Sequence, residues 1–160
     1  MFQHTVNLTV PGLTAQQVYD FMINPTSERY SQWWPGEHLE FEIVKRGDAS
    51  HLGDTVFVDE HLGPNHRIRF RGLVVAADRP HTIVWQMVKA GLRLPAFLEL
   101  ELHDAPEGLL LKHELRLGWP GIAGKATDWT IKLYFNKAFQ NAVENHCKQE
   151  WPMLVEFLKQ

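Results

Sequence analysis

The chain has 160 residues, of which 44% are hydrophobic and 22% charged, and this balance predicts one folded domain spanning residues 1–160. Its formal net charge of −3 provides no broad basic surface, so nucleic acid is not an expected partner. The sequence contains no apolar run long enough to cross a membrane, no signal-peptide pattern at its start and a single cysteine, Cys147. These features predict a cytoplasmic protein with no transmembrane segment.

The first third of the chain predicts one strand followed by two short helices. Residues Phe2 to Val10 alternate between polar and apolar types, which is typical of a strand with one buried face. Thr14 is then expected to cap a helix that ends at Asn24, and a second helical turn is expected over residues 26–32. Of the adjacent indoles Trp33 and Trp34, one is expected to lie in the core and the other to be partly exposed.

Six further strands are expected between the indoles and residue 117. Their apolar alternation and the turn residues between them predict strands over residues 39–43, 54–61, 67–74, 82–88, 96–103 and 108–117. The segment from Lys89 to Pro95 is expected to be a loop.

Two hairpins allow a prediction of register. If Pro64 and Asn65 form the tip of the first, Glu60 lies opposite Arg69 on the solvent face, and Asp59 and His61 point inward. A bulge in this turn would reverse the two faces. In the second hairpin, the match of apolar faces predicts the pairs Leu98–His113, Leu100–Leu111, Leu102–Leu109 and Glu99–Lys112.

The last third of the chain reads as one long amphipathic helix from about Thr127 to Gln160. Asp128 is the expected N-cap, and Pro152 is expected to kink or restart the helix after Trp151. At 100° per residue, the predicted inward face consists of Ile131, Phe135, Ala138, Phe139, Ala142 and Val143.

A run of antiparallel strands closed by a long helix indicates an α+β fold, with a curved sheet wrapped around the helix. In this arrangement the chain resembles the START-like superfamily, the polyketide cyclase/dehydrase and lipid transport proteins, which have a helix-grip fold. The resemblance rests on Trp33-Trp34-Pro35, on the Asp78-Arg79-Pro80 turn before Ile83-Val84-Trp85, and on the closing helix. It implies a tunnel for an apolar or aromatic small molecule, and some of these proteins are cyclases.

The sequence predicts no metal site and no cofactor. Its nine histidines are dispersed, with no His-x-x-x-His pair on a helix, and no cysteine pair is present. Glycine-rich phosphate loops and a Gly-x-Ser-x-Gly nucleophile motif are also absent from the sequence.

Polar residues that interrupt apolar faces are the candidate site residues. His146 and Glu150 lie one helical turn apart near the inward helix face, and His113 interrupts a leucine stripe. One interpretation is that His146 and Glu150 form a structural or half-exposed pair with no functional role, since buried polar groups need partners. The alternative is that they converge in an apolar pocket, with Asp59 or His61 joining them.

The leading hypothesis is therefore binding of a hydrophobic, lipid-like or polyketide-like small molecule between helix and sheet. The expected ligand-binding residues are Phe135, Phe139, Ala142, His146, His113, Trp85 and Trp33. One alternative is a polyketide cyclase or dehydratase, in which His146 or His113 is the base and Asp59 or Glu150 is its partner. Another is a protein-interaction module with an apolar patch outside the cavity.

Overall fold

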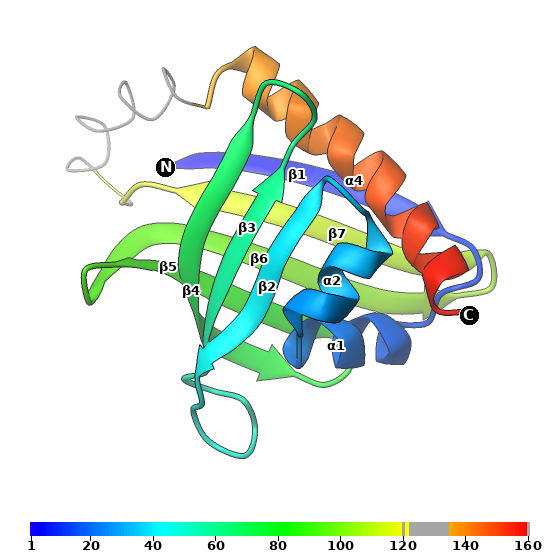
Figure 1. Ribbon diagram of the computed structural model, residues 1–160, viewed down its shortest axis with the longest axis horizontal. Coiled ribbons are helices and arrows are strands. Elements are labelled where there is room, and N and C mark those ends of the chain that lie inside the picture. The colour runs from blue at the N-terminus through cyan, green and yellow to red at the C-terminus, as the bar shows by residue number, and fades with distance from the viewer. Residues whose placement is uncertain (120, 122–134, 160) are drawn as a thin grey trace.

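The computed structural model describes residues 1–119, 121 and 135–159 (Figure 1). Its elements, in chain order, are β1 (Phe2–Val10), α1 (Ala15–Ile23), α2 (Ser27–Trp33), β2 (His38–Lys45), β3 (Thr55–His61), β4 (Arg67–Asp78), β5 (Thr82–Lys89), β6 (Leu92–Ala105), β7 (Gly108–Leu117) and α4 (Lys137–Phe157). None of the helices in these ranges is long and apolar enough to span a membrane.

The strands form one antiparallel sheet of seven strands in the order β1-β7-β6-β5-β4-β3-β2. The sheet curves so that α4 lies against its concave side, and α1 and α2 lie near one end of the curve (Figure 1). This arrangement confirms the predicted α+β helix-grip fold. Because the sheet is strongly curved, it faces α4 from more than one side, and the core fills the space between them.

Helices α1 and α2 each begin directly after a threonine that caps the first turn. The Thr14 hydroxyl oxygen accepts a hydrogen bond from the Gln17 backbone N–H, and the Gln17 side-chain oxygen accepts one from the Thr14 backbone N–H, so α1 begins with a capping box. Thr26 caps α2 in the same way, through the amide of Arg29. At the end of α2, Trp33 is buried and Trp34 is partly exposed, as expected.

Helix α4 begins later than predicted, and it does not restart at its proline. It begins at Lys137 because the side chain of Asn136 accepts a hydrogen bond from the Phe139 amide at 3.1 Å. The predicted cap Asp128 lies outside the described residues, as do Trp129, Ile131 and Tyr134. Pro152 does not end or restart the helix, which continues to Phe157. The cost of one lost backbone hydrogen bond is offset by burial of Leu154 beyond it.

The inward face of α4 is also rotated relative to the prediction. Its buried residues are Val143, His146, Cys147, Glu150, Trp151, Leu154 and Val155, whereas Ala138 is exposed. The prediction was right for Phe135, Phe139 and Val143, which line the space between helix and sheet, and wrong for Ala138 and Ala142. It weighted the first turns of the segment, whereas most buried residues of the observed helix lie in the later turns.

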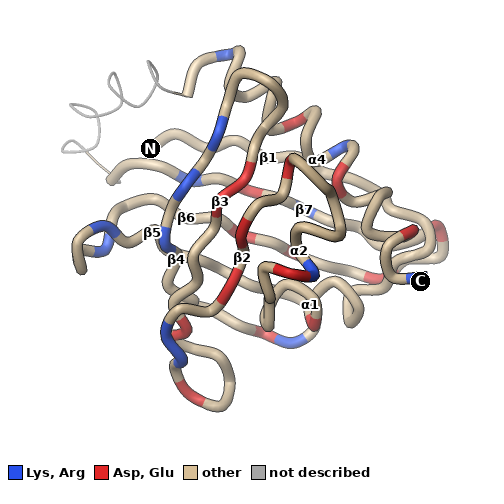
Figure 2. Tube along the Cα trace, in the orientation of Figure 1, with Lys and Arg blue, Asp and Glu red and all other residues tan. Residues whose placement is uncertain are grey.

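The register predicted for the hairpin of β3 and β4 was wrong by one residue. Asp59 pairs with Arg69 and Glu60 pairs with Ile68, because residues Leu62 to His66 form a connection with an odd number of residues. Asp59 therefore shares the outer face with the arginines, and Glu60 points inward. Figure 2 shows basic residues along β4 beside acidic residues on β3 and β2.

Two features of β6 also differ from the prediction. The expected loop from Lys89 to Pro95 is a tight turn at Ala90-Gly91, both with positive φ, so that β6 already begins at Leu92. In the hairpin with β7, Leu100 pairs with His113, two residues away from the predicted register. A shift of two residues keeps every side chain on its predicted face, so the inward position of His113 is unaffected.

Candidate functional site

A cavity of about 260 Å³ lies between α4 and the concave face of the sheet. Its wall is mainly apolar, and includes Met22, Phe41, Val56, Val58, Trp85, Leu98, Leu100, Leu115, Phe135, Phe139 and Val143. Polar side chains are few, and four of them come from α2 (Tyr30), β3 (Glu60) and α4 (His146 and Glu150). Folded cores contain few voids larger than a water molecule, so a cavity of this size is unusual for a structural core.

The structure brings most of the predicted site residues to this cavity. Six of them line it: Trp85, His113, Phe135, Phe139, His146 and Glu150. Phe135 and Phe139 contact one another edge to face, with ring centroids 4.8 Å apart, and pack beside a small cluster of Ala96, Leu115 and Leu117. His113 lies in β7, is half-buried and lines the cavity.

Two of the predicted ligand-binding residues, Ala142 and Trp33, lie elsewhere. Ala142 borders a separate groove on the outer side of α4, together with Trp34 and the Leu62–His66 turn. Trp33 is only 2% exposed and does not line the cavity, since its ring packs against Trp151 and its indole N–H donates to the Glu150 backbone carbonyl at 3.0 Å.

Asp59 points away from the cavity as well. Its carboxylate accepts two hydrogen bonds from the Arg67 guanidinium, at 2.7 and 2.8 Å, and lies 3.4 Å from Arg69. The bonded guanidinium lowers the pKa of this carboxyl group. His61 is engaged with the Gly36 carbonyl oxygen at 3.0 Å. Neither residue is therefore placed to act with His146.

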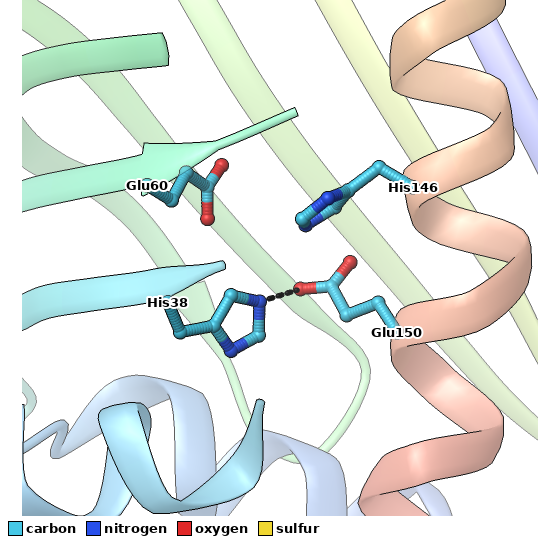
Figure 3. A group of neighbouring side chains, drawn as sticks. All are labelled: His38, Glu60, His146 and Glu150. Carbon is cyan, nitrogen blue, oxygen red and sulfur yellow. Dashed lines mark ion pairs between the residues drawn. The ribbon is translucent and has the colours of Figure 1, made fainter. Parts of the chain in front are cut away.

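Two residues that the sequence did not single out, His38 and Glu60, complete a polar cluster with His146 and Glu150 (Figure 3). Glu60 was assigned to the wrong face by the one-residue register error. His38 is placed inward by a bulge between it and Glu40, which breaks the simple alternation that makes Phe41 the buried residue of β2. Neither the odd turn nor the bulge has a clear signature in the sequence.

The four side chains of this cluster converge from three elements. One ligating atom from each residue lies within 4.8 Å of those of the other three. His38 Nε2 and Glu150 Oε1 are 3.5 Å apart, without hydrogen-bond alignment. None of the ring nitrogens of His38 and His146 has a hydrogen-bond partner among the described residues. The rings are nevertheless fixed, because His38 stacks on Tyr30 at 4.0 Å and His146 stacks on Trp34 at 4.6 Å.

Burial controls the charges at this end of the cavity. Desolvation raises the pKa of Glu150 to about 7, and desolvation together with the charge of Glu150 raises the pKa of Glu60 to about 7. Desolvation lowers the pKa of His38 to about 4 and also lowers that of His146. The Tyr30 hydroxyl donates a hydrogen bond to the Glu60 carboxylate. The imidazoles are thus neutral near pH 7, and the described residues provide no lysine or arginine partner for either carboxylate.

No protein-family model and no curated protein matches the chain. Solved structures match it over most of its length. The KanY protein has 11% identity and a TM-score of 0.61, and the match covers 99% of this chain and 98% of that one. A protein from Rhodobacter sphaeroides has 15% identity and a TM-score of 0.60, with 96% and 93% covered. The major latex-like protein 151 from Panax ginseng has 11% identity and a TM-score of 0.58, with 91% and 96% covered. At these identities the likeness is one of fold.

Proposed function

We propose that this chain, whose fold is the START-like helix grip, binds a hydrophobic small molecule of aromatic or lipid-like type between α4 and the sheet. The observation that carries the proposal is the cavity of about 260 Å³ with its largely apolar wall. An apolar cavity of about 150 Å³ is enough to take up benzene, so this one has room for a larger ligand. Phe135, Phe139 and Trp85 supply aromatic surface for contact with it.

Binding without catalysis is favoured over the version of the cyclase or dehydratase alternative in which His113 is the base and Asp59 is its partner. A general base works best when its pKa lies near the working pH. Burial lowers the pKa of His113 to about 4, so this imidazole is a weak base at neutral pH. Asp59, the predicted partner of that base, accepts a hydrogen bond from Arg67 on the outer face of the sheet.

Adjacent residues of α4 provide a matched test of the binding site. Val143 is 6% exposed and lines the cavity, whereas Ala142 borders the outer groove. We expect Val143→Trp to abolish binding of an apolar fluorescent probe, because the indole occupies the cavity. Ala142→Trp places the same indole in the outer groove and should bind the probe as the wild type does. Fluorescence titration of the three proteins measures the difference.

The folded state of each variant is checked by circular dichroism and urea unfolding. Val58→Phe fills the cavity from the sheet side and replaces Val143→Trp if that variant does not fold. Probe binding that survives both cavity substitutions, or that is lost equally in Ala142→Trp, would contradict the proposed site. Native mass spectrometry of the purified wild type then identifies the class of any apolar molecule that accompanies it.

A further inference from the structure

The polar cluster at the end of the cavity has the composition of a metal site. His146 and Glu150 are four residues apart on α4, so both side chains project from one helix face toward the sheet. His38 at the start of β2 and Glu60 near the end of β3 project toward them from the other side (Figure 3). Two imidazoles and two carboxylates therefore meet at one point, with their ligating atoms within 4.8 Å of one another.

The two histidines are buried, and their ring nitrogens have no hydrogen-bond partner within the described ranges. His38 is 1% exposed and His146 is 5% exposed, and neither ring has a hydrogen bond among the described residues. Buried polar atoms nearly always have a partner, and leaving one unpaired costs about 1–3 kcal/mol. Because both rings are oriented into the cluster by stacking on Tyr30 and Trp34, a ligand at its centre would satisfy a nitrogen from each.

The charge of the cluster is also unbalanced. Glu60 and Glu150 bring two carboxylates into a buried space, and within the described ranges the only ion pair to either is the 3.5 Å approach of His38 to Glu150. Buried carboxylates are normally paired with a cation or bound to a metal. A divalent ion between them would neutralise both charges at once.

We propose that His38, Glu60, His146 and Glu150 bind one divalent transition-metal ion, with Zn²⁺ as the best-matched ion. Two imidazole nitrogens and two carboxylate oxygens form a four-ligand set of the kind zinc accepts in tetrahedral geometry. With metal–ligand bonds of about 2.0–2.2 Å, the ligating atoms must move to roughly 3.3–3.5 Å from one another. Side-chain rotations supply this movement, since the backbone positions already place all four side chains toward one centre.

Neighbouring groups are placed to hold the ligands once they are bound. The Tyr30 hydroxyl donates to Glu60, and the Trp33 indole N–H fixes the α4 backbone at the Glu150 carbonyl. Such outer contacts orient metal ligands and raise metal affinity. Glu60, His146 and Glu150 also line the cavity, so the ion would be accessible from it. The proposal departs from the sequence-based expectation of no metal, which rested on the dispersal of the histidines along the chain.

The test uses the full chain, stripped of metal with a chelator and titrated calorimetrically with Zn²⁺. We expect one ion per chain in the wild type, and zinc should raise its melting temperature because it binds the folded state. Glu150→Gln and His146→Gln keep side-chain size and should weaken binding by roughly 100-fold or more, since even outer contacts to metal ligands contribute 10–100-fold. His103→Gln removes one ring of an exposed stacked pair with His81 and should leave the affinity unchanged.

X-ray absorption of the zinc-loaded wild type provides a measurement that does not depend on the variants folding. We expect a shell of nitrogen and oxygen with two imidazoles and no sulfur, even though Cys147 is a buried neighbour on α4. Equal zinc affinity in all four proteins would identify an adventitious surface ion and overturn the proposal. A sulfur ligand, or a wild type that binds no zinc, would overturn it as well.

Discussion

Leu154→Ala is expected to lower the free energy of unfolding by about 3–5 kcal/mol, the upper range for a leucine truncated inside a packed core. Leu154 is 0% exposed and lies in the last turns of α4, where the helix contacts the main core cluster. Its side chain does not line the cavity, so the truncation creates a new void in close-packed surroundings.

Phe139→Ala is the matched substitution near the other end of the same helix. Phe139 is only half-buried and one side of its ring faces the cavity, so its removal mainly enlarges a space that already exists. We expect a smaller loss of about 1–2 kcal/mol, since less apolar surface returns to water and fewer contacts are broken. Urea unfolding of both variants, with unchanged m-values as the control for two-state behaviour, provides the comparison. Equal losses at the two positions would show that α4 is packed solidly along its whole length.

A large pH-dependent effect on stability is expected from His113. Burial in the cavity wall, with a smaller contribution from the charges of His146 and His4, lowers the pKa of this imidazole from 6.5 to about 4. The unfolded chain therefore binds a proton that the folded chain does not accept between about pH 6.5 and 4. Folding stability must fall as the pH decreases through this window, by up to about 3 kcal/mol for this group alone. Above about pH 6.5 both states are neutral and the contribution disappears.

His113→Leu should remove this contribution while keeping the position apolar. Near pH 7 we expect the variant to match the wild type or to exceed it by up to about 1 kcal/mol, because the desolvation cost of the imidazole is lost. Near pH 4 the variant should be more stable by about 3 kcal/mol. Urea unfolding of both proteins at several pH values measures the difference.

The two ways in which this expectation can fail carry different meanings. Parallel pH profiles would show that the His113 ring is well hydrated within the cavity. A loss of more than about 2 kcal/mol in the variant near pH 7 would show that His113 holds a hydrogen-bond network, and would remove it from the binding site.

The elements of this fold could be predicted because each has a local signal. Thr14 caps α1, Asn24 ends it, and the period-two alternation of Phe2 to Val10 specifies β1. His113 could be placed inward for a similar reason, since even a two-residue shift in register keeps a side chain on the same face. The location of the chain in the cytoplasm and the absence of a nucleic-acid partner stay predictions.

Two of the four residues of the polar cluster could be predicted from the sequence. The other two depend on irregular strand pairing. His146 and Glu150 follow from helical spacing within a single element. His38 depends on a bulge in β2, and Glu60 depends on the number of residues in a turn, neither of which leaves a clear mark on hydrophobic periodicity. The sequence therefore identified Asp59 where the structure places its neighbour Glu60.

The number of residues in the turn between β3 and β4 determines which side chains of β3 face the interior and which face outward. An odd number of residues from Leu62 to His66 directs Glu60 to the interior and leaves Asp59 with Arg67 outside. Deleting one residue of this turn while β4 keeps its place would exchange the roles of the two acids. It would also carry Val56 and Val58 from the interior to the solvent face. Turn length is therefore as much a determinant of the cavity's chemistry as any side chain that lines it, and homologous chains with a turn of different length should not be expected to share that chemistry.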